Sequence, residues 1–245
     1  MKKKSPKSKR FWIVTFSIVA VMIMAPFSSY PLSYQPQDNA KVAYTSATQF
    51  NGYYEFKIES ASVGIIFYPG GLVNPIAYAG LAKALSLETN SSVFVTQPLW
   101  NLAITNIEGA TAIINSNPMI QTWFLGGHSL GGSSAAFYTI DHIDTIQGLF
   151  FLASYTTQDA DFSSGLLPIL TITGSNDQIL DIETYQSAQV YTSPITTNVI
   201  IEGGNHSQFG DYGFQRGDGE ATISLLEQMN QTIFAIETWL STLVQ

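Results

Sequence analysis

The sequence predicts an α/β fold in which a mostly parallel sheet carries helices on both faces. From residue 62 onward, short and almost continuously apolar runs alternate with segments whose apolar residues recur at helical spacing. A strand that is buried on both faces is apolar throughout, whereas a strand with one wet face alternates apolar and polar residues. Hydrophobic residues make up 45% of the 245 residues, which is enough for one sizeable core.

The individual elements follow from the same patterns. We expect the folded body to begin near Ala40 with an antiparallel hairpin, whose strands span residues 41–47 and 53–59 around an Asn51-Gly52 turn. The expected strands of the parallel sheet span residues 62–68, 92–97, 121–125, 148–153, 167–173 and 198–202. The expected helices span residues 74–87, 105–114, 182–190 and 220–243, with one more after the glycine-rich turn at 126–132. Only residues 155–165 separate two of these strands, so we expect no large cap domain there.

The chain before the body has its own composition. Six of the ten cations lie in the first ten residues, an apolar run follows, and Pro31 and Pro36 then indicate an extended linker. We therefore expect a basic cytoplasmic tail, a transmembrane anchor or signal segment, a linker and an α/β domain, at residues 1–10, 11–27, 28–39 and 40–245.

The apolar run at residues 11–27 predicts a membrane segment, because a spanning helix needs roughly 17 to 25 apolar residues. The alternative is a secretory signal peptide that is cleaved. The small residue best placed for cleavage is Ala25, but Pro26 follows it and Ile23 stands two positions before it. We therefore expect an uncleaved single-pass anchor. Lys and Arg stay on the cytoplasmic side, so either alternative places the body outside the cytoplasm.

Charge and composition argue against some classes of function. The part of the chain after residue 10 contains 18 acidic and four basic residues, a formal net charge of −14. Nucleic-acid binding needs a basic surface, and so acidic a body repels polyanions. The absence of cysteine excludes disulfides, thiolate metal sites and a cysteine nucleophile. We therefore expect no nucleic-acid partner.

The strongest motif is GHSLG at residues 127–131, which matches G-x-S-x-G. In this motif a nucleophile lies on a sharp, strained turn between a strand and a helix, and the flanking glycines avoid collisions with neighbouring backbone. An apolar run precedes the motif here, and a small-residue helix pattern follows it. The free N–H groups at the start of that helix also favour negative charge. Ser129 is the expected nucleophile.

The expected general base is His206, which follows the last expected strand in the stretch GGNHSQFGDYG. His128 lies inside the motif, where its side chain is expected to point away from that of the nucleophile. His142 lies late in the following helix and is expected to be a solvated residue at the helix end. In folds in which the nucleophile lies on such a strand-to-helix turn, the nucleophile, the acid and the histidine follow one another in this order along the chain, which favours His206.

The expected acid is Asp177, in the turn after the strand at residues 167–173. Its role would be to fix the tautomer of the base and to stabilise the imidazolium. Asp181 is the alternative, but it is better placed to cap the helix that begins at Ile182.

Two backbone N–H groups are expected to hold the oxyanion. One belongs to Leu130, the residue after the nucleophile, and the other to Gly71 in the loop after the strand at 62–68, with Leu72 as the alternative. A plain turn would also explain Pro-Gly-Gly at this place. Leu72 and Trp100 are the expected substrate-binding residues, although core packing explains the apolar residues around Trp100 equally well.

Six segments carry a resemblance to a known family, namely FYPGG at 67–71, PLWNLA at 98–103, GGHSLGG at 126–132, FLASY at 151–155, GGNHSQFGDYG at 203–213 and GDGEATIS at 217–224. Together they resemble the bacterial α/β-hydrolase fold-5 family, relatives of the dienelactone hydrolases. The resemblance runs from Val63 to the C-terminus. It implies the α/β-hydrolase fold and a triad of Ser129, Asp177 and His206. A serine stands where dienelactone hydrolases have a cysteine, so the resemblance does not extend to that substrate.

These residues predict a serine hydrolase that acts on a small neutral ester or related acyl compound through an acyl-enzyme. An acyltransferase or peptidase acting on cell-envelope material would use the same triad and is the alternative. A non-catalytic binding module would need a damaged triad, and this one is intact in sequence. No metal and no organic cofactor is expected.

Overall fold

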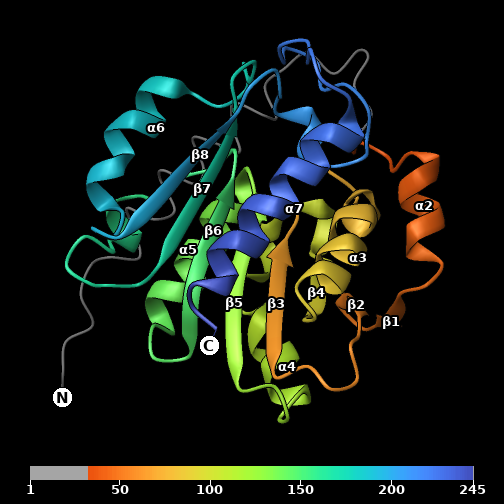
Figure 1. The fold of residues 1–245 in the computed structure, drawn as a ribbon, viewed down its shortest axis with the longest axis vertical. Helices are drawn as coiled ribbons and strands as arrows, with labels where there is room; N and C mark the ends of the chain where they lie inside the picture. Colours follow the sequence, from red (N-terminus) through yellow and green to blue (C-terminus); the bar gives the residue numbers. More distant parts are fainter. Residues whose placement is uncertain (1–32, 245) are drawn as a thin grey trace. The chain divides into compact units, whose positions relative to one another are not determined.

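The computed structural model describes residues 33–244, which are built around one eight-stranded sheet (Figure 1). The strand order is β1-β2-β4-β3-β5-β6-β7-β8. The strands are β1 (Thr48–Phe50), β2 (Tyr53–Phe56), β3 (Val63–Tyr68), β4 (Ser92–Thr96), β5 (Thr122–His128), β6 (Ile146–Leu152), β7 (Ile169–Gly174) and β8 (Thr196–Ile201). The β1–β2 and β2–β4 pairs are antiparallel and all the others are parallel, which confirms the mostly parallel sheet.

Helices cover both faces of the sheet, also as predicted (Figure 1). On one face lie α3 (Ala79–Glu88) and α7 (Leu225–Ser241), with α2 (Asp38–Tyr44) beside α3. On the other lie α4 (Gly109–Ser116) and α5 (Leu130–Asp141), and α6 (Ile182–Ala188) follows β7. Each face has its own cluster of buried apolar side chains.

Strand β3 explains why the central strands are apolar without interruption. Its Ile65 and Phe67 belong to the cluster on the α3 and α7 face, and its Ile66 and Tyr68 belong to the cluster on the α5 face. Successive side chains of a strand point to opposite faces, and here both faces are dry. The parallel strands also end at the same edge of the sheet. The segments that follow β3, β5, β7 and β8 therefore meet there.

The predicted hairpin exists, but its first strand was placed wrongly. Lys41 to Tyr44 belong to α2, and the strand that pairs with β2 across the Asn51-Gly52 turn is Thr48–Phe50. Asp211, from a loop far along the chain, accepts the N–H of Ala40 at 3.0 Å and thereby holds the first turn of α2. A contact with a residue 171 positions away leaves no local pattern in the sequence.

Part of the segment predicted as a linker, at residues 28–39, is described by the structure from Ser33 onward. Tyr34 forms a bridge with Val73, its N–H donates to the carbonyl of Leu72 at 2.8 Å, and its carbonyl accepts the N–H of Asn74 at 2.9 Å. The segment from Ser33 therefore packs on the loop after β3. The basic tail at residues 1–10 and the membrane segment at 11–27 lie outside the described residues. Within residues 33–244, no helix is both long enough and apolar enough to cross a bilayer.

Two other predicted features can be compared directly. The last helix begins at Leu225, not at residue 220, because Ser224 caps it by accepting the N–H of Glu227 at 3.2 Å. A Ser-x-x-Glu capping box accounts for this start. Between β6 and β7, residues 153–168 contain one 3-10 turn, Gln158–Ala160, so no cap domain is inserted there, as predicted.

Candidate active site

Ser129 lies on the turn between β5 and α5. Its φ of +52° and ψ of −123° lie in a region that residues with a side chain rarely adopt, at a cost of about 1–3 kcal/mol. Its N–H donates to the carbonyl of Leu152 at 2.9 Å, and its carbonyl accepts the hydroxyl of Ser154 at 2.7 Å. These bonds to β6 and the segment after it hold the strained turn in place.

Two glycines allow this turn to form. A Cβ at Gly131 would lie 2.1 Å from the carbonyl oxygen of Tyr68, and a Cβ at Gly127 would lie 2.5 Å from the carbonyl carbon of Gly131. Both obstacles are backbone atoms, so no change of rotamer relieves the overlap. The glycines of the motif thus bring the start of α5 against the end of β3.

We expect Gly131→Ala to lower the free energy of unfolding by about 3 kcal/mol, since the backbone must move to admit the methyl group. Gly80→Ala in α3 is the matched control. A Cβ at Gly80 meets only the sulfur of Met229, at 3.8 Å, so alanine is expected to raise stability by about 0.5–1 kcal/mol. Chemical denaturation followed by circular dichroism measures both values. Equal effects for the two variants would contradict the close contact at the turn.

Asp177 and His206 form a buried pair. Nδ1 of His206 lies 2.8 Å from Oδ2 of Asp177, and the two side chains are 2% and 3% exposed. The other carboxylate oxygen, Oδ1, accepts the N–H groups of Ile179 at 2.9 Å and Leu180 at 2.8 Å. A carboxylate held in this way keeps the proton of the imidazole on Nδ1 and leaves Nε2 as the basic atom.

The rival residues have other contacts. Asp181 caps α6 by accepting the N–H of Thr184 at 2.9 Å, and Asp177, not Asp181, is the aspartate that meets His206. His142 follows the last residue of α5, at the opposite end of that helix from Ser129, with its Nε2 3.2 Å from Glu108.

The hydroxyl of Ser129 forms no hydrogen bond with any residue of the described range 33–244, so the structure does not join it to His206. The two loops nevertheless meet. The ring of His128, next to Ser129, lies 4.4 Å from the ring of His206, measured between centroids. In free enzymes the contact between a catalytic hydroxyl and its base is often long and shortens when substrate binds.

His128 is buried, and its contact with Tyr78 argues against it as the base. Burial lowers the pKa of His128 well below its ordinary value, and the neighbouring His206 lowers it further. The hydroxyl of Tyr78 accepts the N–H of Gly70 at 3.0 Å and lies 2.8 Å from Nδ1 of His128. Nδ1 is the acceptor available to the hydroxyl proton, so the neutral imidazole carries its own proton on Nε2. Both ring nitrogens are then unable to take a proton from Ser129.

Hydrogen bonding also separates the two candidates for the second oxyanion donor. The N–H of Leu72 donates to the carbonyl of Asn101 at 2.8 Å, and that of Gly70 is bound to Tyr78. The N–H of Gly71 has no partner among the described residues, and neither has that of Leu130 at the start of α5. The two N–H groups expected from the sequence are therefore free, whereas the alternative at Leu72 is occupied.

We expect Tyr78→Phe to lower kcat about 10- to 100-fold with KM nearly unchanged. The hydroxyl of Tyr78 holds the N–H of Gly70, and this bond positions the next amide, the free N–H of Gly71. Tyr54→Phe is the matched control. Tyr54 is also fully buried, and its hydroxyl donates to the carbonyl of Pro75 at 2.9 Å, away from the oxyanion loop. Both variants should lose similar stability, about 1 kcal/mol. Equal loss of kcat in the two would show that the hydroxyl of Tyr78 acts only through stability.

Asp218 is a buried residue of this region that sequence reasoning did not place in the site. Its Oδ2 accepts the N–H and the hydroxyl of Ser207, the N–H at 2.7 Å, and its Oδ1 accepts the N–H of Gln178 at 3.2 Å. It thus joins the loop that carries Asp177 to the loop that carries His206. The only sequence signal was its place in the GDGEATIS segment, between two glycines.

The residues expected to bind substrate, Leu72 and Trp100, lie in the loops after β3 and β4. Trp100 is 78% exposed, so the core-packing alternative is wrong for it. Leu72 is half-buried and has a φ of +59°. Nothing in the structure assigns either side chain to a substrate.

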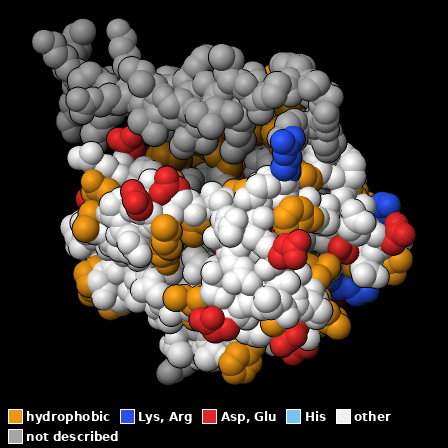
Figure 2. All heavy atoms as spheres, turned by 90° about the horizontal axis from the view of Figure 1, so that it is seen from above, with side chains coloured by type: hydrophobic (Ala, Val, Ile, Leu, Met, Phe, Trp, Pro, Cys, Tyr) orange, Lys and Arg blue, Asp and Glu red, His pale blue; other side chains and the backbone are white. Residues whose placement is uncertain are grey.

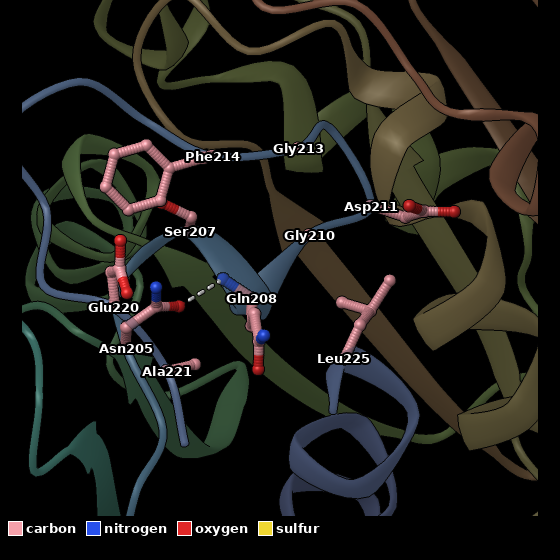
Figure 3. A pocket seen from close by; sticks show the side chains of 10 residues that line it. All are labelled: Asn205, Ser207, Gln208, Gly210, Asp211, Gly213, Phe214, Glu220, Ala221 and Leu225. Carbon is pink, nitrogen blue, oxygen red and sulfur yellow. Dashed lines mark hydrogen bonds between the residues drawn. The ribbon is translucent and has the colours of Figure 1, made fainter. Parts of the chain in front are cut away.

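Figure 3 shows a cavity of about 460 Å³ beside the His206 loop. It is lined by that loop, including Asn205, Ser207 and the half-exposed Phe214, and by Leu225 at the start of α7. The dashed line marks the bond from the N–H of Gln208 to Oδ1 of Asn205. None of the three proposed catalytic side chains lines the cavity, so we do not assign it to the acyl group.

Figure 2 looks down on the end of the molecule toward which the parallel strands point in Figure 1. In the part of this face that is coloured, acidic side chains are scattered and cations occur singly (Figure 2). A nucleic-acid site would need a basic patch. Residues 33–244 contain no group of three or more His, Asp or Glu side chains placed to hold a metal ion.

Known proteins of the same fold share this arrangement of strands and helices. A carboxyl esterase 2 from the fungus Tuber melanosporum has a TM-score of 0.61 at 12% identity, covering 94% of this chain and 98% of its own. A predicted CIB-like hydrolase from Thermoplasma acidophilum has a TM-score of 0.57 at 13% identity, covering 78% and 96%. Est1E from Butyrivibrio proteoclasticus has a TM-score of 0.54 at 14% identity, covering 77% and 94%.

At such identities these structures establish the fold alone. No protein of curated function matches the sequence. The model of the alpha/beta hydrolase family does match, over residues 64–230, a range that begins in β3 and ends within α7. That range contains the turn with Ser129, the Asp177–His206 pair and both free amides. The chain therefore belongs to the alpha/beta hydrolase family.

Proposed function

We propose that the protein hydrolyses carboxylic esters or related acyl compounds through an acyl-enzyme on Ser129. The observation that carries this proposal is the buried hydrogen bond between His206 and Asp177, at the sheet edge where Ser129 follows β5. The free N–H groups of Gly71 and Leu130 support it, since an oxyanion hole needs donors that the protein does not use itself. Family membership supports a hydrolase in general.

The proposed reaction has two halves. Nε2 of His206 takes the proton of the Ser129 hydroxyl, whose oxygen attacks the ester carbonyl carbon, and the N–H groups of Gly71 and Leu130 hold the negative oxygen. His206 then gives its proton to the departing alkoxide, and the acyl group remains on Ser129. In the second half, His206 deprotonates a water molecule, whose oxygen attacks the carbonyl carbon of the acyl-enzyme. The bond to Oγ of Ser129 breaks, Ser129 takes the proton back from His206, and the carboxylic acid is released. Throughout, Asp177 stabilises the imidazolium and keeps it oriented.

The proposed substrates are small and neutral. The acidic body repels anionic compounds, since residues 33–244 carry 18 acidic and four basic side chains. No cap domain is inserted between β6 and β7, so the loops of this one domain shape the site. The fungal protein of the same fold is named as a carboxyl esterase, which agrees with this class.

We also propose that the domain lies outside the cytoplasm, held by an anchor at residues 11–27. The support is the order of the sequence, in which six cations precede an apolar run of membrane-spanning length. Treatment of intact cells and of lysed cells with protease tests this placement. Digestion of the domain in intact cells is the expected result, and protection in them would contradict it.

Labelling with a fluorophosphonate, followed by a panel of esters, tests the chemistry. We expect covalent labelling and faster turnover of short neutral esters than of anionic ones. The acyltransferase or peptidase alternative is tested by adding alcohols and amines as acceptors during turnover. Product that partitions to these acceptors instead of water would favour it, and a folded protein that neither labels nor turns over would overturn the hydrolase proposal.

A further inference from the structure

Two apolar side chains next to the proposed oxyanion loop are held out into solvent. Leu99 and Trp100 lie in the loop after β4 and are 67% and 78% exposed. Trp100 and Asn101 both have left-handed backbones, with φ values of +54° and +56°. Two such residues in succession are strained, and contacts with the surrounding structure must hold them in this conformation. The strained backbone holds the side chains of Leu99 and Trp100 in solvent, and we call these two residues the apolar rim.

Asn101 fixes the apolar rim to two other segments. Its carbonyl accepts the N–H of Leu72 at 2.8 Å, which places the rim beside Gly71. Its side-chain N–H donates to the hydroxyl of Ser33 at 2.7 Å. Tyr34, the next residue, is bonded through its N–H to the carbonyl of Leu72. The rim, the oxyanion loop and the chain that leads from the N-terminal segment are thus joined by hydrogen bonds.

The position of Ser33 limits how far the apolar rim can lie from a membrane. The apolar run ends at residue 27, and six residues of extended chain span at most about 22 Å. If that run anchors the protein, Ser33 cannot lie farther than this from the bilayer surface. The rim, which is bonded to Ser33 through Asn101, must lie near it as well.

The segments that meet at the rim also lack charge. Residues 28–37, 60–82 and 89–107 contain no Asp, Glu, Lys or Arg, although the body has a net charge of −14. Acidic side chains would be repelled by anionic lipid headgroups, and charged groups resist transfer to the interface. Tryptophan, in contrast, favours the headgroup region, where one end of its ring system is apolar and the other is wet.

We propose that Leu99 and Trp100 enter the headgroup region of the membrane that holds the N-terminal segment, so that the Ser129 site opens beside the lipid surface. The proposal rests on the proposed anchor and deepens the proposed function, since esters that partition into lipid would then reach Ser129 from the bilayer. Two inserted side chains add modest affinity, so the anchor holds the protein and the rim orients it.

The absence of cysteine in the chain permits a direct test. The full chain carrying Leu99→Cys or Trp100→Cys is labelled with an environment-sensitive fluorophore and reconstituted into phosphatidylethanolamine and phosphatidylglycerol vesicles. Met119→Cys is the matched control, because Met119 is 83% exposed and precedes β5, at the opposite end of the sheet. Lipids with a nitroxide at headgroup depth should quench the labels at 99 and 100 at least about threefold more than the label at 119.

Equal quenching at the three positions would overturn the proposal, as would a protein that does not float with the vesicles. Labels at 99 and 100 that are shielded from aqueous iodide but not quenched by the lipids would mean that protein covers the rim, and would also contradict it. Fluorophosphonate labelling of the same samples reports separately on the chemistry. Lipid contact without that labelling would sink the proposed function and leave the membrane contact standing.

Discussion

Ser129→Ala should lower kcat toward a p-nitrophenyl ester by about 10⁴- to 10⁶-fold and leave KM within about threefold. The hydroxyl oxygen is the atom that would form the acyl-enzyme, and alanine offers no replacement for it. The backbone of the turn should persist, because its hydrogen bonds to Leu152 and Ser154 involve the N–H and carbonyl of residue 129. Stability should therefore change little.

The matched control is Ser187→Ala, on the exposed face of α6, where the hydroxyl bonds only the carbonyl of Thr184. It should keep full activity. Steady-state kinetics and thermal unfolding of the two variants separate chemistry from folding. A stable Ser129→Ala protein that retains more than about 10% of kcat would show that another residue is the nucleophile.

Asp177→Asn should lower kcat by about 10⁴-fold. The carboxylate accepts three hydrogen bonds, one from Nδ1 of His206 and two from the N–H groups of Ile179 and Leu180. An amide has one oxygen and one NH₂ group, so it cannot accept from both sides. If the amide oxygen of the introduced asparagine accepts the two backbone N–H groups, its NH₂ group faces Nδ1 of His206. The imidazole proton must then lie on Nε2, and Nε2 cannot act as the base.

Asp181→Asn is the control for this prediction, since asparagine caps a helix as well as aspartate does. It should leave kcat within about twofold and stability within about 0.5 kcal/mol. The pair of variants also decides between the two acids that the sequence left open. Similar losses in both, or a larger loss in Asp181→Asn, would remove Asp177 from the proposed mechanism.

Much of the fold follows from pattern alone, and the reason is burial. Strands such as β3 and β5 are covered on both faces, so their apolar runs mark them clearly, and the glycine-rich turn fixes where β5 ends. The N-terminal part of the body was harder to predict. Residues 41–44 form a helix that depends on Asp211, and Tyr34 is ordered by the loop after β3. Such long-range contacts override local propensity.

The candidate site also has features that the sequence predicts and features that depend on long-range contacts. Ser129, Asp177 and His206 follow the ends of parallel strands, and such ends lie at one edge of a sheet, so their place at that edge was predictable. The sequence favoured Gly71 over Leu72 as an oxyanion donor, but the physical reason, the bond from Leu72 to the carbonyl of Asn101, could not be predicted. Neither could the contact of Tyr78 with His128, which joins two turns 50 residues apart.

In the proposed mechanism, the hydroxyl of Ser129, the imidazole of His206 and the amides of Gly71 and Leu130 surround one reacting atom. A crystal structure of the fluorophosphonate adduct measures this directly. We predict phosphorus bound to Oγ of Ser129, with Nε2 of His206 in hydrogen-bond reach of the adduct and a phosphonyl oxygen about 2.7–3.1 Å from both amide nitrogens. An adduct on another residue, or one on Ser129 whose oxygen faces away from Gly71 and Leu130, would contradict this mechanism.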